Sequence, residues 1–312
     1  MPDIVVMFFL LGLVAGVLKS DLTIPKAAYD TLSLLLMLTI GLKGGMALYG
    51  NLGWSLLPEL LAVAALGALI PLALMPVLRR VVRLSPADST SIAAHYGSVS
   101  AGTFAVALSF AESRALPIGA EVTLYLVMME LPAIMVAIAL YRRHAGKNSG
   151  EAMQGIWHET LTNRGVILLA GGAVIGAMYG PGEGSDVTEL FMGAFHAVLA
   201  LFLLQMGLTA AETLRPIPWF HWRLLTFALV APFVLSLAGL AVGLALGLPS
   251  GSLLILTALA ASASYIAAPA AMRTAIPEAN IGLAMLAALG FTFPLNVIVG
   301  IPIYHQLALW LG

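Results

Sequence analysis

Residues 95–104 read His-Tyr-Gly-Ser-Val-Ser-Ala-Gly-Thr-Phe, and residues 261–270 read Ala-Ser-Ala-Ser-Tyr-Ile-Ala-Ala-Pro-Ala. Each stretch lies near the middle of an apolar run that is long enough to form one membrane-spanning helix. Glycine and serine weaken the first helix, while Pro269 removes a backbone donor from the second and suits the start of a new helix. We therefore expect two discontinuous helices, each made of two half-helices that meet near the middle of a membrane.

The composition indicates that lipid is the solvent for much of the chain. Of its 312 residues, 61% are hydrophobic and 9% are charged, and the mean hydropathy is +1.00. Soluble domains carry about a quarter charged residues, and a soluble core of this length could not bury so much apolar surface. The chain has no cysteine, which excludes disulfides, thiolate metal sites and a cysteine nucleophile. The net charge of −1 carries no information about nucleic acid, but the chain has no basic arm, and no nucleic-acid partner is expected.

Ten apolar runs are candidate membrane spans, because a spanning helix needs about 20 mostly apolar residues and proline or glycine turn signals separate the runs. The expected spans are 4–18, 28–50, 56–78, 88–111, 117–141, 160–180, 187–212, 222–248, 252–274 and 280–309. The only sizeable polar stretch, 143–159, is expected to be a cytoplasmic linker. It separates a first five-helix repeat, residues 1–142, from a second, residues 160–312.

The two halves resemble each other. Residues 39–45 (Thr-Ile-Gly-Leu-Lys-Gly-Gly) resemble residues 205–211 (Gln-Met-Gly-Leu-Thr-Ala-Ala), and the fifth and tenth spans carry Pro132 and Pro294 at similar places. Because five is an odd number, the second repeat enters the membrane upside down, as in many secondary transporters. The predicted fold is an all-α membrane protein with ten transmembrane helices in a 5+5 inverted repeat. Its fourth and ninth spans are the discontinuous ones.

The basic residues predict the orientation. Of the 14 lysines and arginines, Lys43 lies inside a span and Arg114 lies on one side, and the other twelve fall together on the opposite side. The twelve are Lys19, Lys26, Arg79, Arg80, Arg83, Arg142, Arg143, Lys147, Arg164, Arg215, Arg223 and Arg273. By the positive-inside rule their side is cytoplasmic, so both termini are extracytoplasmic. We expect a multi-pass protein of the bacterial inner membrane.

The two breaks suggest an anion site. If both helices unwind, their second halves begin near the midplane and direct free N–H groups and positive dipole ends into one small volume. Hydroxyl groups of Ser98, Ser100, Thr103, Ser262 and Ser264 add further donors. This arrangement suits a small oxyanion, and the carbonyl groups that end the first half-helices suit a cation such as Na⁺. The alternative is that the small residues only allow tight helix packing, with serine and threonine bonded to their own helices.

Two ionisable residues, Lys43 and Glu130, lie well inside predicted spans, where a charge is costly and usually pairs or marks an ion path. They could form one ion pair that fastens the second span to the fifth. Alternatively, Glu130 helps to bind or sense a coupling cation. Thr292 and Asn296, on either side of Pro294, mark an irregular point whose freed carbonyl groups could line a cation site or belong to a tolerated kink.

Four segments resemble the sodium-dependent bicarbonate permease family, SbtA, and the resemblance extends over nearly the whole chain. They are residues 41–45, 97–100, 261–270 and 291–296. The resemblance implies Na⁺-coupled uptake of bicarbonate by a homotrimer, in which a core domain moves against a gate domain and both domains draw helices from both repeats. It also implies an anion held between the two broken helices. Cyanobacterial members are regulated by a PII-like trimer, SbtB, and have a longer central loop than this chain.

The expected site residues fall into three groups. By resemblance, the anion is bound by Gly97, Ser98, Val99, Ser100, Ser262, Ala263 and Ser264. Gly102, Thr103 and Glu130 are assigned to Na⁺, although cyanobacterial members carry an aspartate near the position of Glu130. Supporting roles are expected for Lys43, Pro269, Thr292 and Asn296. Beyond Na⁺ as coupling ion, no cofactor is expected.

Three other functions remain open from the sequence. The same fold could carry another small anion or an organic acid, although no arginine lies inside a span to clamp a carboxylate. A channel is also compatible with the sequence. An intramembrane serine hydrolase would use Ser98 or Ser100 as nucleophile and His95 or His196 as base, but it would leave the second break without a role. We therefore expect a transporter and not an enzyme.

Overall fold

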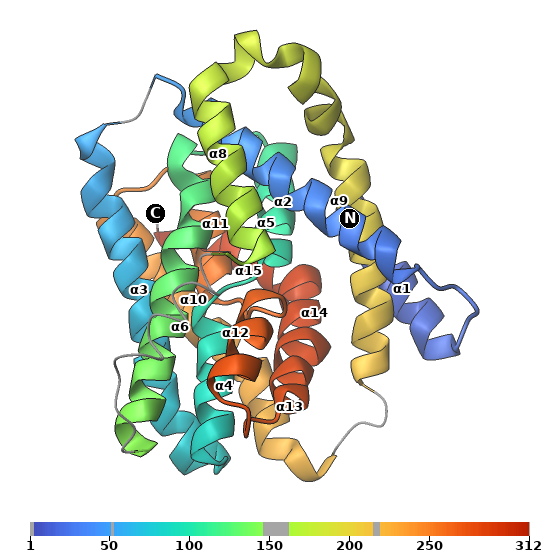
Figure 1. Cartoon of the computed structure of the whole chain (residues 1–312), viewed down its shortest axis with the longest axis vertical. Helices are drawn as coiled ribbons and strands as arrows, with labels where there is room; N and C mark the ends of the chain where they lie inside the picture. The colour runs from blue at the N-terminus through green and yellow to red at the C-terminus, as the bar shows by residue number, and fades with distance from the viewer. Residues whose placement is uncertain (1–2, 51–52, 146–161, 215–218, 312) are drawn as a thin grey trace.

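The described chain is helical throughout (Figure 1). The computed structural model describes residues 3–50, 53–145, 162–214 and 219–311, and these contain no β-strand. From residue 146 onward, the linker predicted at 143–159 lies outside the described residues. Seven described helical segments are long and apolar enough to cross a membrane: Lys26–Leu48 (α2), Trp54–Val82 (with α3, Leu57–Val77), Ala120–Arg143 (most of α6, Leu124–Ala145), Arg164–Glu183 (α8), Ser185–Thr213 (α9), Trp219–Ala245 (with α10, Trp222–Ala245) and Ile281–Leu311. The protein is therefore a multi-pass membrane protein.

Five shorter helices occupy the positions of the first, fourth and ninth predicted spans. They are α1 (Ile4–Leu18), α4 (Pro86–Gly97), α5 (Ala101–Ser113), α11 (Ser250–Ala260) and α12 (Ala267–Ala275). None of them alone has the roughly 20 residues that a bilayer requires. The predicted run 88–111 appears as α4 followed by α5, and the run 252–274 appears as α11 followed by α12.

The last segment, Ile281–Leu311, is an irregular helix. It consists of α13 (Ile281–Met285), a π-helical stretch (Leu286–Thr292), α14 (Phe293–Leu295), a second π-helical stretch (Asn296–Gly300) and α15 (Ile301–Leu311). Pro294 has no backbone N–H, so a regular α-helical ladder cannot continue through it. Wide turns on either side are a usual adjustment, and they leave Thr292 and Asn296 at the irregular points.

The helices form two groups (Figure 1). We call α1, α2, α8 and α9 the four-helix set, because α2 packs along α8 and α9, and α1 packs along α9. We call α3, α4, α5, α6 and α10 to α15 the larger set, whose members pack mainly on one another. The two sets meet where α2 contacts the turn Ala120–Thr123 before α6, where α9 contacts the π-helical stretch Leu286–Thr292, and where α5 contacts α9 and α6 contacts α8. The ends of α4, α5, α11 and α12 at the two interruptions all belong to the larger set.

Glycines bring the helices of the four-helix set into backbone contact. A Cβ on Gly12 of α1 or on Gly207 of α9 would lie 2.0 Å or 2.2 Å from a carbonyl oxygen of the facing helix. In the pair α2 and α8, a Cβ on Gly45 or Gly176 would lie 2.1 Å or 2.4 Å from such an oxygen. Any side chain at these positions would push the helices apart, which explains why small residues stand there.

Candidate functional site

The first break separates α4 from α5 over residues 98–100. Val99 has φ of +48°, which is a true outlier for a β-branched residue. Ser100 follows in an extended conformation, and its Oγ accepts a hydrogen bond from the Thr103 amide at 3.1 Å, which caps α5. Strained backbone of this kind persists only where its surroundings hold it, and it gathers at functional sites.

The second break separates α11 from α12 over residues 261–266. The Ser262 hydroxyl donates to the Leu259 carbonyl at 2.8 Å, near the end of α11. Ser264 Oγ accepts from the Ala268 amide at 3.2 Å and so satisfies one of the free donors in the first turn of α12. Pro269 lies in the same turn, where its missing N–H leaves no helical bond unmade.

The two breaks contact each other directly. The Ser100 amide donates to Ser262 Oγ at 2.8 Å, and the Ser264 amide donates to the His95 carbonyl at 2.6 Å. All four residues are buried. Two segments more than 160 residues apart in the sequence are thus joined at the start of α5. The Ser262 hydroxyl accepts a hydrogen bond from an amide that would otherwise have no partner at the N-terminus of α5.

A small cavity lies beside this contact, between the larger set and the four-helix set. Its lining comes from both breaks, α6, α2 and the start of α8: Met37, Val99, Ser100, Ala101, Glu130, Asn163, Gly165, Leu169, Ser264, Tyr265, Ile266 and Ala267. Glu130 is half-buried, and its Oε1 is fully enclosed without a hydrogen-bond partner among the described residues. An unpaired carboxylate oxygen in such a place is costly, and hard cations bind oxygen ligands of this kind. The donor set therefore fits Na⁺.

Further polar atoms near the breaks are buried without partners. In the part of the chain that the structure describes, they include Ser98 Oγ, Thr103 Oγ1 and His95 Nε2. None of these three residues lines the small cavity. Because buried polar atoms in folded proteins nearly always have a partner, these groups are available to a ligand or to water.

The irregular C-terminal segment braces both breaks. Asn296 Nδ2 donates to the Ala261 carbonyl at 2.8 Å, directly after α11. Thr292 Oγ1 donates to the Ala228 carbonyl at 2.9 Å and shares a hydrogen bond of 2.6 Å with the Tyr96 hydroxyl, one residue before the end of α4. The side chains of Thr292 and Asn296 thus tie helices together at the ends of α4 and α11.

The prediction of an ion pair between Lys43 and Glu130 is wrong. Lys43 Nζ instead lies 2.5 Å from Glu112 Oε1, at the last turn of α5, and 4.5 Å from the centroid of the Phe195 ring on α9. Depth along the membrane normal placed Lys43 and Glu130 at similar levels, but it carries no information on which helices are neighbours. Lys43 faces α5 and α9, whereas Glu130 faces the cavity.

The hydrolase alternative has no matching geometry within the described residues. His95 Nδ1 bonds to the Ser91 carbonyl of its own helix at 2.7 Å, and Ser98 Oγ has no hydrogen-bond partner there. His196 lies on α9 with its side chain 54% exposed, and its nearest acidic group is Glu112 at 4.0 Å. Neither histidine is hydrogen-bonded to a candidate nucleophile, which is the arrangement that an activated serine needs.

Eight of the residues that line the cavity were not assigned to the site from the sequence, among them Tyr265, Asn163 and Met37. A Cβ on Gly102 would lie 2.0 Å from the Tyr265 hydroxyl, so this glycine makes room for the tyrosine, whose ring packs edge-on against Phe293. Asn163 caps α8 by accepting from an amide of its first turn at 2.9 Å. A polar residue directly before an apolar run signals such a cap, so Asn163 could have been found. Met37 is an apolar residue in an apolar helix and gives no signal.

These features define a multi-pass helical membrane protein in which four short helices end at two touching interruptions inside the bundle, a design used by secondary transporters. A profile of the Na⁺-dependent bicarbonate transporter superfamily matches residues 4–309, and the chain belongs to this superfamily. The match confirms the family predicted from the sequence resemblance. A search of curated proteins found no match to the chain. The family indicates a transporter that handles bicarbonate and depends on Na⁺.

Proposed function

We propose that the protein is a secondary active transporter that couples the uptake of bicarbonate to Na⁺ across the bacterial inner membrane. The observation that supports this most directly is the contact between the breaks, in which the Ser100 amide meets Ser262 Oγ at 2.8 Å. Amide groups and the positive dipole end of α5 are directed at this point, which favours a small anion there. The family match supplies the identity of the anion.

In the proposed anion site, bicarbonate displaces the Ser262 hydroxyl as the acceptor of the Ser100 amide. The Ser98 hydroxyl, which is buried without a partner in the described structure, donates a second hydrogen bond. Backbone and side-chain groups of the two breaks would complete the shell: Gly97, Ser98, Val99, Ser100, Ser262, Ala263 and Ser264. Among the described residues, no lysine or arginine lines the cavity beside this contact, so the anion is held by neutral donors and can be released again.

In the proposed cation site, Na⁺ binds the free carboxylate oxygen of Glu130 in the small cavity. Ser100 and Ser264 line the same cavity, and Gly102 and Thr103 stand in the first turn of α5 beside it. The two ion sites then share Ser100, so an ion that orders this residue lowers the cost of binding the other. Coupling between Na⁺ and anion follows from this shared element.

The packing supports an inverted repeat of ten spans. The close glycine contacts pair α1 of the first repeat with α9 of the second, and α8 of the second with α2 of the first. Such exchanged partners are expected when two inverted copies are related by a twofold axis. We propose that the four-helix set is the gate and the larger set the moving core, with both termini extracytoplasmic, a cytoplasmic linker at 143–159 and a homotrimeric assembly.

Proteoliposomes test the proposal. With an inward Na⁺ gradient, they should accumulate labelled bicarbonate above the external concentration, and collapse of the gradient should release it. Equal uptake with K⁺ or choline would contradict Na⁺ coupling, and simple equilibration without accumulation would indicate a channel. Competition by unlabelled formate, nitrate or acetate separates bicarbonate from another small anion or an organic acid.

A further inference from the structure

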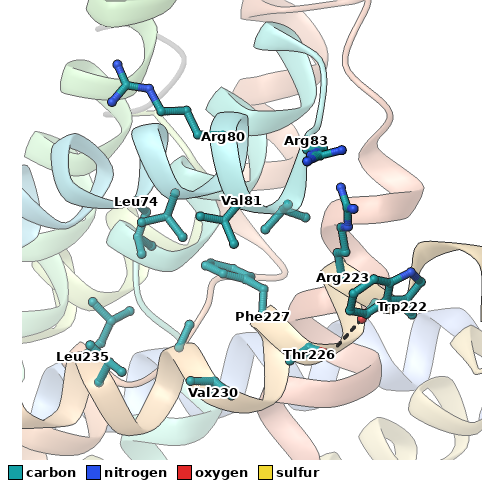
Figure 2. A pocket seen from close by; sticks show the side chains of 14 residues that line it. Leu74, Arg80, Val81, Arg83, Trp222, Arg223, Thr226, Phe227, Val230 and Leu235 are labelled. Atoms are coloured by element: carbon teal, nitrogen blue, oxygen red, sulfur yellow. Dashed lines mark hydrogen bonds between the residues drawn. The ribbon is translucent and has the colours of Figure 1, made fainter.

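A wide groove runs along the outer face of the larger set, between α10 and the end of α3 with its π-helical continuation Leu78–Val82 (Figure 2). Its lining is apolar except for three arginines and a threonine: Leu74, Val77, Arg80, Val81, Val82, Arg83, Trp222, Arg223, Thr226, Phe227, Val230, Ala231, Val234 and Leu235. Val81, Val230 and Val234 are each more than half exposed. In Figure 2 Arg83, Arg223 and Trp222 stand near one another at one end, and Leu235 lies at the other.

None of the three arginines forms an ion pair with an acidic side chain of the described residues, and two of them, Arg83 and Arg223, lie at the same end of the groove. Arg223 lies 5.3 Å from the centroid of the Trp222 ring. Arg83 has φ of +67° and ends the π-helical stretch, so its position depends on an uncommon backbone conformation. Guanidinium groups bind phosphate through two parallel hydrogen bonds, and two of them at one end of a groove favour a phosphate over a single carboxylate.

We propose that this groove binds one anionic phospholipid of the cytoplasmic leaflet, with phosphatidylglycerol as the probe. Arg83 and Arg223 bind the phosphate, and an acyl chain lies along Phe227, Val230 and Val234. Basic pockets between membrane helices on the cytoplasmic side bind anionic headgroups in this way, and tryptophan marks the depth of the headgroups. Both arginines belong to the side that the charge distribution assigns to the cytoplasm.

The inner wall of the groove leads to the first break. The Phe227 ring packs edge-on against the Tyr96 ring, with centroids 5.1 Å apart, and Tyr96 precedes the last residue of α4. On the other wall, a Cβ on Gly97 would lie 2.7 Å from the Pro71 ring, one turn before Leu74. Both walls therefore touch the end of α4. A bound lipid holds the walls at their present spacing, so it also changes the rate of transport.

Native mass spectrometry of the purified protein tests the headgroup site. Titration with phosphatidylglycerol should show saturable binding of one lipid per chain, which phosphatidylcholine does not match. Arg83→Ala and Arg223→Ala should each weaken this binding about fivefold. Arg79→Ala is the matched control, because Arg79 lies on the same π-helical stretch but does not line the groove. Equal binding of the two lipids, or unchanged binding in the double variant, would overturn the proposal.

A second pair of variants tests the acyl-chain site. Val230→Trp fills the groove from an exposed position, whereas Leu237→Trp adds the same side chain to another exposed position of α10 outside it. Only the first should abolish phosphatidylglycerol binding and the response of uptake to this lipid in vesicles. The chain has no cysteine, so Val230→Cys introduces a unique thiol. Efficient disulfide formation between two copies through this thiol would show that a second copy of the chain occupies the groove, and it would overturn the proposal of a bound lipid.

Discussion

Lys43 Nζ lies 2.5 Å from Glu112 Oε1, and this ion pair joins α2 of the four-helix set to α5 of the larger set. Both side chains are about one quarter exposed, at 26% and 28%, so water screens the pair in part. Pairs of this kind contribute roughly 1 kcal/mol or less. If the larger set moves against the four-helix set during transport, the pair has to break. It therefore stabilises the arrangement seen here relative to others.

Breaking this pair should change transport more than folding. Lys43→Met and Glu112→Gln should each lower the free energy of unfolding by about 1 kcal/mol or less, and each should change the rate of uptake. A double-mutant cycle on both quantities gives the coupling energy, and the exchanged pair Lys43→Glu with Glu112→Lys should recover part of it. Effects of the two substitutions that simply add would show that the residues do not act as a pair.

Substitutions of two serines at the breaks should affect bicarbonate affinity and protein stability differently. The Ser262 hydroxyl accepts from the Ser100 amide, so Ser262→Ala leaves a buried N–H unpaired and should cost about 1–3 kcal/mol of stability. Ser98 Oγ has no protein partner in the described structure, so Ser98→Ala should leave the melting temperature unchanged. Uptake kinetics should nevertheless show bicarbonate affinity reduced roughly tenfold or more by Ser98→Ala, because a hydrogen bond to a charged ligand is lost.

Bulky replacements at the same serines provide the complementary measurement. Ser98→Trp and Ser262→Trp should abolish anion binding, whereas size-exclusion chromatography should show a folded protein for at least Ser98→Trp. If Ser98→Ala binds bicarbonate as the unchanged protein does, and Ser98→Trp does too, the anion lies elsewhere.

Glu130 should control the dependence on Na⁺. Its Oε1 is enclosed and unpaired among the described residues, so Glu130→Gln removes a buried charge and should leave stability equal or higher. The same substitution should remove the stimulation of uptake by Na⁺, because a neutral amide is a weak ligand for a hard cation. Glu130→Asp keeps the charge and should retain stimulation at a higher Na⁺ concentration. A Glu130→Gln protein that only melts earlier, with Na⁺ stimulation intact, would assign this residue to structure alone.

The sequence indicated where the helices end, because that information is local. Glycine and serine around residue 98 and the small residues before Pro269 disfavour helix whatever surrounds them, and α4 and α11 end at Gly97 and Ala260. The length of the apolar runs also predicted the seven segments of the described residues that are long and apolar enough to cross a membrane, whereas the first predicted span is a helix of only 15 residues. The shared family followed from the same local motifs.

The pairing between distant residues could not be read in this way. Depth along the membrane normal suggested Glu130 as the partner of Lys43, and only the arrangement of the helices in space brings Lys43 to Glu112 of α5 and to the Phe195 ring of α9. The bond from the Ser100 amide to Ser262 depends on the approach of two helix ends, which no single segment encodes. In the sequence, the exposed valines of the groove between α3 and α10 cannot be distinguished from other lipid-facing residues. Only the structure places them in one groove with the arginines at its end.

Glycine contacts in the four-helix set give a test of the inverted repeat. A Cβ on Gly176 would lie 2.4 Å from a backbone oxygen of α2, and a Cβ on Gly207 would lie 2.2 Å from one of α1. Gly176→Ala and Gly207→Ala should therefore each lower the free energy of unfolding by about 1–3 kcal/mol, since backbone cannot move aside easily. A Cβ on Gly171 of α8 or on Gly193 of α9 would have nothing within 4 Å, so Gly171→Ala and Gly193→Ala should be neutral or slightly stabilising.

Thermal unfolding in detergent measures the stability of all four variants. Similar losses of stability at the two close contacts are expected if the pair of α2 with α8 and the pair of α9 with α1 are equivalent. If only one of the two substitutions lowers the free energy of unfolding, the two helix pairs contribute unequally to stability. That result would argue against a symmetric gate.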